Sequence, residues 1–130
     1  MIKQINQVLE FHQKFNIFSA DKPSIPEEYL QDLRDKLISE EAHEVSKAMI
    51  NEEGLDQVAK ELCDLLYVTY GTILTYGLQN KIEQCFDEVH RSNMSKLGKD
   101  GKPVYREDGK LLKGDNYSVA DIKSILEGNV

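Results

Sequence analysis

The stretch YLQDLRDKLISEEAHEVSKA, residues 29–48, decides the fold, because it predicts a long helix whose apolar face contains acids. At about 100° per residue, the apolar residues that share one stripe of this helix are Leu30, Leu33, Leu37 and Ala48. Glu41 and Glu44 project within about 40° of the centre of that stripe at Leu37, where the next core residues are expected. Glu40 lies at the edge of the stripe, and His43 points away from it. The sequence therefore places carboxylates on a face that should be buried.

Three further helices are expected around this stretch. The four expected helices cover residues 2–15, Pro26 to about Glu53, about Asp56 to Tyr76, and Asn80 to about Leu97. Gly54 and Gly77 follow the second and third helices as stop signals. Asn80 and Glu83 resemble a capping box at the start of the fourth. Such short connections favour antiparallel neighbours in a bundle.

The C-terminal part has a different composition, with glycines and short apolar pairs. Asp108-Gly109 predicts a hairpin with a two-residue turn, and Ser118 and Asp121 predict the cap of a short final helix. The expected fold class is therefore all-α, with a four-helix-bundle-like core over about residues 2–97. A small basic hairpin and a short terminal helix follow over about residues 98–130, within a single domain.

Charge and composition restrict the partners. The net charge of −7 gives the chain no general attraction for nucleic acid or anionic membranes. The N-terminus lacks the apolar run of a signal peptide, and residues 62–78 are too short and too polar for a clear membrane span. Cys63 and Cys85 have no CxxC spacing and are expected to be buried thiols in a reducing compartment. We therefore expect a cytoplasmic protein.

A second pair of carboxylates, Glu61 and Asp64, lies on one side of the third helix. No formal charge follows Asp64 until Lys81, so this carboxylate is expected to be partly shielded from water. Carboxylates that converge from two helices repel each other unless they are protonated or share a cation. An oxygen-only set favours Mg²⁺, with Mn²⁺ as a substitute. The alternative is a solvated acidic face, since the pair lies opposite the apolar stripe of its own helix. That stripe consists of Leu55, Val58, Leu62, Leu65 and Ile73.

The fourth helix and the segment after it carry a basic complement. Asn93 and Lys96 continue the apolar stripe formed by Ile82, Phe86 and Val89. The basic residues of the segment that follows are Lys96, Lys99, Lys102, Arg106, Lys110 and Lys113. They are candidates for holding phosphates, although lysines on a hairpin also serve solubility.

Three positions near the acidic residues have two interpretations each. Tyr67 lies about 60° from Asp64 and is either a stacking surface for a base or a packing tyrosine. His12, on the core side of the first helix, is either a ligand contact or an interior histidine. Gly71 and Thr75 continue the Asp64 face with small side chains, which permits close approach of a helix or subunit.

The acidic residues also form a known pattern: EEAHE, sixteen residues, then ELCD. This resembles the MazG-like all-α nucleoside triphosphate pyrophosphohydrolase superfamily. The tail VHRSNMSKLGKDGKPVYREDGKLLKGDNY, residues 89–117, is similar to its phosphoribosyl-ATP-pyrophosphohydrolase-like branch. The resemblance covers nearly the whole chain.

The resemblance implies Mg²⁺-dependent cleavage of a nucleoside triphosphate to the monophosphate and pyrophosphate, by a homodimer or homotetramer. It implies metal ligands at Glu41, Glu44, Glu61 and Asp64, and catalytic roles for Glu40, Glu41 and Lys96. Asn93 and Lys96 match positions that contact the nucleotide, and we add Tyr67, Arg91 and Lys113 as candidate substrate-binding residues. Candidate substrates include dUTP and damaged nucleotides, with phosphoribosyl-ATP as an alternative.

Two other classes of function compete with this one. Glu40-x-x-His43 and Asp87-x-x-His90 have the spacing of di-iron helical bundles, but both histidines point away from the apolar stripes. The remaining alternative is an inactive nucleotide-binding module, which need not keep all five carboxylates.

Overall fold

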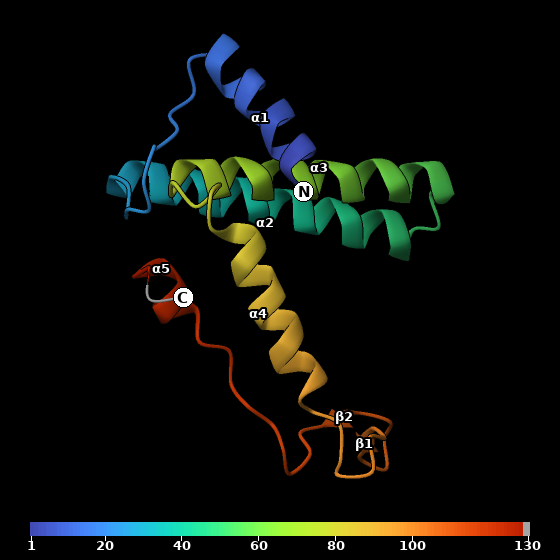
Figure 1. Ribbon diagram of the computed structural model, residues 1–130. Helices are drawn as coiled ribbons and strands as arrows, with labels where there is room; N and C mark the ends of the chain where they lie inside the picture. The colour runs from blue at the N-terminus through green and yellow to red at the C-terminus, as the bar shows by residue number, and fades with distance from the viewer. Residues whose placement is uncertain (129–130) are drawn as a thin grey trace. The chain divides into compact units, whose positions relative to one another are not determined.

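The computed structural model describes residues 1–128, which are mostly helical (Figure 1). Its elements are α1 (Ile2–Lys14), α2 (Glu28–Ile50), α3 (Leu55–Thr75), α4 (Ile82–Met94), β1 (Val104–Tyr105), β2 (Leu111–Leu112) and α5 (Ile122–Leu126). The expected helical fold with a small hairpin and a short final helix is confirmed. Residues 129 and 130, at the end of the expected C-terminal part, lie outside the described residues. The chain divides into two compact units, and the boundary lies between Asn80 and Lys81.

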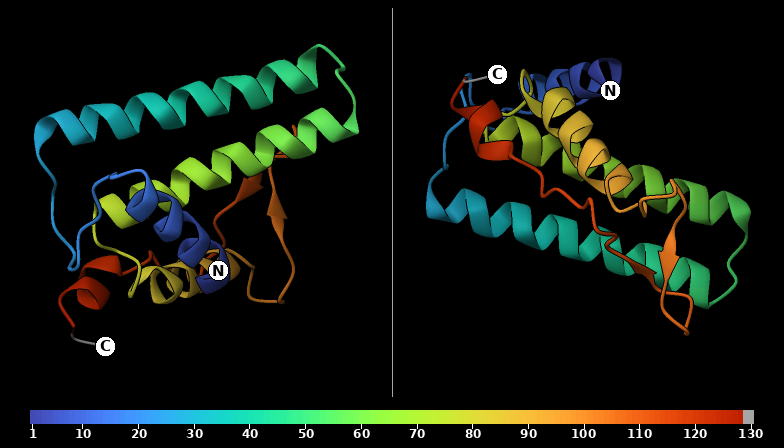
Figure 2. Two further views of the ribbon diagram at one scale, coloured as in Figure 1. Left: turned by 90° about the horizontal axis from the view of Figure 1, so that it is seen from above. Right: turned by 60° about the horizontal axis from the view of Figure 1, so that its bottom comes forward.

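In the first unit, α2 and α3 run antiparallel side by side, and α1 packs on α3 (Figure 2). The buried residues of the three helices are Ile5, Val8 and His12, then Leu30, Arg34, Val45 and Ala48, then Gly71, Leu74 and Thr75. Gly71 allows the close approach, because a Cβ atom there would clash with Arg34 and would lie 3.0 Å from His12 Nε2. The expected small-residue face on α3 is confirmed as a helix-packing face.

The segment between α1 and α2 is attached to the end of α3 by backbone hydrogen bonds. The amide of Ala20 donates to the carbonyl of Leu74 at 2.9 Å, and the amide of Ser24 donates to that of Tyr76 at 3.0 Å. These bonds fix the position of the loop that follows α1, and so they hold α1 against α3.

In the second unit, α5 is held against α4 through side chains of α4. Glu88 accepts two hydrogen bonds of 2.8 Å from the guanidinium of Arg91, and a third of 3.0 Å from the amide of Asp121. The amide of Ser118 donates to Oγ of Ser95 at 2.8 Å. Asp121 caps α5 by accepting from the amide of Ser124.

The hairpin corrects one expectation about its turn. The paired positions are Val104 with Leu112 and Tyr105 with Leu111. The amide of Arg106 then donates to the carbonyl of Lys110 at 2.8 Å, so three residues form the loop rather than two. Gly109, with φ of 87°, is the last of the three, which is the usual place for a left-handed residue in such a loop.

Other expectations about helix starts and apolar faces were also wrong. Lys81 occupies the N-cap of α4 without a side-chain cap, so Asn80 does not begin a capping box there. On α2 the helix starts at Glu28, after Pro26. Cys85 is buried as expected, but Cys63 is exposed. Apolar residues expected in stripes but exposed in this chain are Leu33, Leu55, Leu62, Phe86 and Val89. None of the helices in residues 1–128 is both long and apolar enough to cross a bilayer.

Candidate functional site

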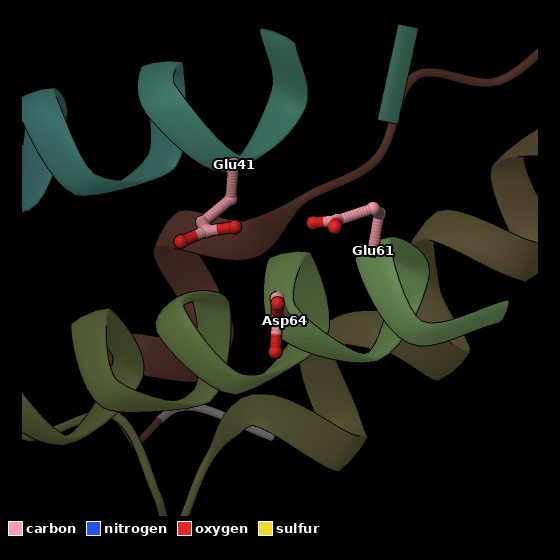
Figure 3. A group of neighbouring side chains, drawn as sticks. All are labelled: Glu41, Glu61 and Asp64. Atoms are coloured by element: carbon pink, nitrogen blue, oxygen red, sulfur yellow. The ribbon is translucent and has the colours of Figure 1, made fainter. Parts of the chain in front are cut away.

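Three carboxylates from two antiparallel helices meet in the first unit. Glu41 of α2 and Glu61 and Asp64 of α3 each offer an oxygen atom, and these oxygens all lie within 4.8 Å of one another. Figure 3 shows Glu41 pointing from one helix toward the two acids of the other. All three side chains are half-buried. This spacing suits a shared cation, which three negatively charged groups need in order to remain ionised together.

The electrostatics of Glu41 are those of a carboxylate in a crowded acidic site. Burial raises the pKa of Glu41 above its usual value of 4.5, and the charges of Asp64 and Glu61 raise it further. Lys60 lowers it, and Glu44 adds a smaller rise. Ionisation of Glu41 therefore costs more in the metal-free protein than it does in water, and a divalent cation would relieve that cost.

Lys60 supplies the positive charge nearest to the acids of α3. Its Nζ atom lies 2.6 Å from Oδ2 of Asp64 and 3.6 Å from Oε1 of Glu61. The pair with Asp64 raises the pKa of Lys60, so this ammonium group stays charged. Lys60 was not among the residues predicted from the sequence, although its i, i+4 spacing to Asp64 favours this ion pair.

The two other acids of the EEAHE motif lie outside this group of three. Glu44 is half-buried and close enough to affect the pKa of Glu41. Glu40 is exposed, as is His43. The structure thus brings together three of the four expected metal ligands, and Glu44 and Glu40 remain predictions.

A cavity of about 400 Å³ opens beside Glu41 and Asp64. Its other lining residues are Val8, Phe11, His12, Ile17, Arg34, Leu37, Tyr67 and Val68. The volume is in the range of small-molecule sites, and the wall is mainly apolar with a few polar groups. It is suited to an organic group attached to a phosphate chain that the acids would bind through a cation.

Tyr67 and Phe11 form an aromatic wall of this cavity. Their ring centroids lie 5.6 Å apart in an edge-to-face arrangement, with an interplanar angle of 83°. Tyr67 is 41% exposed, so its ring is accessible from the cavity as well as packed against Phe11. Both interpretations given for Tyr67 therefore remain compatible with its place in the structure.

Arg34 and His12 are polar groups that line the cavity. Arg34 was not predicted as a site residue, and His12 had two interpretations, a ligand contact or an interior histidine. Arg34 is only 5% exposed; its Nε donates to Oγ1 of Thr72 at 3.1 Å and its Nη2 to the carbonyl of Val68 at 2.9 Å. His12 is 2% exposed, and its Nδ1 lies 3.0 Å from Oγ of Ser19. Burial lowers the pKa of both side chains, and the charge of Arg34 lowers that of His12 further. The position of Arg34 beside the apolar stripe of α2 is the feature of the sequence that could have indicated a buried cation.

The remaining candidates belong to the second unit. Asn93 is exposed on α4, and Lys96 is half-buried just after it. Arg91 is engaged with Glu88, and its Nη2 also donates to the carbonyl of Val119 at 3.2 Å. Lys113 lies over the ring of Tyr117, with Nζ 4.6 Å from the centroid.

This chain is similar to a family of known enzymes and to solved structures. A protein from Exiguobacterium sp. 255-15, provisionally described as an NTP pyrophosphohydrolase, is 26% identical, with 95% of this chain and 92% of that chain covered and a TM-score of 0.44. No curated protein matches the chain. The model of the phosphoribosyl-ATP pyrophosphohydrolase family matches residues 8–93, which include the three clustered acids. This match spans well over half of the sequence, and the chain belongs to the phosphoribosyl-ATP pyrophosphohydrolase family.

Proposed function

We propose that this hydrolase of phosphoric anhydride bonds depends on Mg²⁺ and cleaves a nucleoside triphosphate to the monophosphate and pyrophosphate. The observation that carries the proposal is the meeting of Glu41, Glu61 and Asp64 within 4.8 Å beside a cavity of nucleoside size. Family membership supports the type of bond, and the acidic cluster supports the divalent metal.

The donor set fits Mg²⁺ better than a softer metal. It consists of carboxylate oxygens, and no histidine or cysteine joins it among the described residues. Mg²⁺ prefers such ligands and usually completes its shell with water and substrate phosphates. When bound, the ion supplies charge neutralisation for the phosphates and a more acidic bound water. Glu41, Glu61 and Asp64 would hold it, with Glu44 as the fourth expected ligand.

The chain's own residues supply the other parts of the reaction. Glu40 is exposed and adjacent to a ligand, and we assign it the role of accepting a proton from the attacking water at its carboxylate. We assign Lys96 and Asn93 to the phosphates, with Arg91 and Lys113 as further contacts. The three basic side chains supply positive charge to an otherwise acidic chain, and the amide of Asn93 supplies hydrogen-bond donors. Tyr67 is assigned to the nucleoside because it lines the cavity.

Product analysis tests this function. Purified protein is incubated with a panel of NTPs and dNTPs, including dUTP, with Mg²⁺, Mn²⁺ or EDTA, and the products are separated by chromatography. Monophosphate and pyrophosphate, formed with a divalent ion and not with EDTA, are expected. Diphosphate and phosphate, or no turnover of any nucleotide, would refute the proposal. Asp64→Asn should abolish turnover while the helical circular dichroism signal is kept.

Phosphoribosyl-ATP is a second candidate substrate, and the family match is the observation that favours it. It belongs in the same assay at matched concentration. A kcat/KM for phosphoribosyl-ATP far above those of all simple triphosphates would make it the substrate instead.

We further propose that the protein is a homodimer or homotetramer in the cytoplasm. Several large apolar side chains of α3 and α4 are exposed in the single chain, among them Leu62, Leu66 and Phe86. Free Cys63 and Cys85 are consistent with a reducing compartment. Sedimentation equilibrium measures the assembly: a monomer at micromolar concentration would contradict the first part.

A further inference from the structure

Arg34 is a buried cation that no carboxylate of residues 1–128 neutralises. Among the described residues it forms no salt bridge, and its hydrogen bonds go to the neutral oxygens of Thr72 and Val68. Burying an unpaired charge is costly, so a ligand that pairs with the guanidinium would offset that cost. Arg34 also lines the cavity that contains Glu41 and Asp64.

The two protein contacts occupy only one edge of the guanidinium group. Nε and Nη2 donate from the edge that faces α3, while Nη1 has no hydrogen-bond partner in residues 1–128. The only fully enclosed side-chain nitrogen or oxygen without a partner in that range is Oε1 of Gln79. Nη1 therefore keeps accessible surface. Together with the remaining N–H of Nη2, it offers a fork of two parallel donors.

The position of this fork along α2 indicates which part of a nucleotide it would meet. Arg34 precedes Glu41 by seven residues, which is two helical turns or about 10 Å. The acids mark the end of the cavity for the metal and the phosphates. Apolar side chains, including Leu37, Val68 and Ile17, also line the cavity. A planar nucleobase suits the Arg34 end.

A phosphate group suits that end less well. Among the described residues that line the cavity, Arg34 is the only fixed positive charge. The pKa of its neighbour His12 is lowered by burial and by Arg34 itself. A dianion would gain one charged partner and lose its hydration. A neutral base edge with two adjacent acceptors matches the donor fork without that cost.

We propose that Arg34 is a specificity-determining residue that donates from Nη1 and Nη2 to O6 and N7 of a 6-oxopurine base. This is the acceptor pair that arginine reads most commonly on a base edge. Adenine presents a donor at the position of O6, and uracil presents N3–H next to O4, so neither offers both acceptors to the fork. Cytosine does present two adjacent acceptors, O2 and N3, and the comparison of GTP with CTP distinguishes the two bases. The inference rests on the proposed function for the identity of the substrate as a nucleotide.

The first test uses wild-type protein and changes only the substrate. The values of kcat/KM are measured for GTP, ITP, ATP, UTP and CTP, and for 7-deaza-GTP, which lacks the N7 acceptor. GTP and ITP should exceed the other three by about tenfold or more, and 7-deaza-GTP should lose about tenfold to a hundredfold relative to GTP. A preference for ATP, UTP or CTP, or equal rates for GTP and 7-deaza-GTP, would overturn the inference.

The second test changes Arg34 while keeping its charge. Arg34→Lys removes the fork and should reduce the GTP-to-ATP ratio of kcat/KM toward one. Lys36→Gln on the same helix is exposed and serves as the matched control, with an unchanged ratio. An Arg34→Lys protein that folds, as judged by circular dichroism, and keeps the wild-type ratio would refute the role. If that variant does not fold, the 7-deaza-GTP comparison decides.

Binding of the monophosphates separates this inference from the proposed function. Calorimetry with GMP, IMP, AMP and UMP requires no turnover. Tighter binding of GMP and IMP without hydrolysis of any triphosphate would leave the role of Arg34 standing and refute the hydrolase. Hydrolysis of all triphosphates without a base preference would support the hydrolase and refute the role of Arg34.

Discussion

Nζ of Lys60 lies 2.6 Å from Oδ2 of Asp64, so a residue of the acidic cluster is already paired with a cation of its own helix. Lys60 is largely exposed, with 62% of its side-chain surface accessible, while Glu61 is only 14% exposed. A flexible ammonium group at the edge of a metal site has two opposite effects. It relieves repulsion among the acids when no metal is present, and it competes with a metal for the same oxygens.

Lys60→Gln is therefore expected to bind Mg²⁺ more tightly, by about two- to fivefold, because an exposed ion pair contributes little and its loss removes a competitor. Isothermal titration calorimetry with Mg²⁺ measures the change. Lys36→Gln removes an exposed charge from α2 and should bind Mg²⁺ as the wild type does. Weaker binding by Lys60→Gln would show that Lys60 supports the site rather than competing for it.

Glu41→Gln should have opposite effects on stability and on activity. The pKa of Glu41 is raised in the folded protein by burial and by Asp64 and Glu61. A raised carboxyl pKa costs stability as the pH rises through and above the usual value of 4.5. At neutral pH in EDTA, Glu41→Gln should therefore melt about 1–4 °C above the wild type.

The same substitution removes a proposed metal ligand. The increase in melting temperature that Mg²⁺ gives the wild type should disappear, and kcat should fall by at least about a hundredfold. Asp56→Asn, an exposed acid in the first turn of α3, is the matched control and should keep both properties. A Glu41→Gln protein that Mg²⁺ still stabilises fully would place the ion elsewhere.

Helical periodicity and turn signals predicted the order of the elements, and three of the five acids of the pattern, Glu41, Glu61 and Asp64, do meet. The buried face of α2, however, is centred about 40° from Leu37, near Glu41. Arg34 and Val45 are buried on that side, and Leu33 on the other side is exposed. This rotation explains why Glu41 joins the cluster while Glu44 lies outside it. The positions of the apolar residues alone could not predict this rotation of the buried face, because that face contains Arg34.

The interior face of α3 was misjudged for a related reason. The apolar stripe of leucines predicts one interior face, yet the buried positions are Gly71, Leu74 and Thr75, on the side of Asp64. Small residues bury little area and give a weak hydrophobic signal. They matter here because they let the helices approach closely. This effect cannot be predicted without knowing which residues of the neighbouring helices lie against them.

The length of the hairpin loop and the cap of α5 depend on which of several nearby groups form hydrogen bonds, and a short sequence motif does not determine this choice. Asp108-Gly109 does form the turn, but Arg106 binds Asp108 and pairs with Lys110, which gives the longer loop. Similarly, Asp121 alone caps α5, while the amide of Ser118 is bound to Ser95. The roles of Asn93 and Lys96 came from resemblance, and their chemistry remains a prediction.

Glu88→Gln should loosen α5 from α4. The bonds from Arg91 and from the amide of Asp121 lower the pKa of Glu88 to about 2. A depressed carboxyl pKa contributes stability above the usual value of 4.5, and this contribution is lost as the pH falls from 4.5 toward 2. In the wild type the docking of α5 should therefore weaken over that range, and in the variant it should be weak at all pH values.

Hydrogen exchange of the Asp121 and Ser124 amides at pH 6 measures this docking. Faster exchange is expected in Glu88→Gln, and Glu107→Gln in the exposed hairpin should leave it unchanged. Equal protection in all three proteins would mean that apolar contacts, such as that of buried Ile125, hold α5 without Glu88.

Gly71→Ala should destabilise the first unit, although the same change usually stabilises a helix. In an exposed helix, alanine gains about 1 kcal/mol over glycine. At Gly71 the added Cβ atom would clash with the guanidinium of Arg34 and approach His12. Overpacking of this kind costs about 1–3 kcal/mol, so urea denaturation should give a lower free energy of unfolding. Because Arg34→Lys removes the planar group that the Cβ atom meets, Gly71→Ala should cost less in that background, and an equal cost in both backgrounds would locate the strain elsewhere.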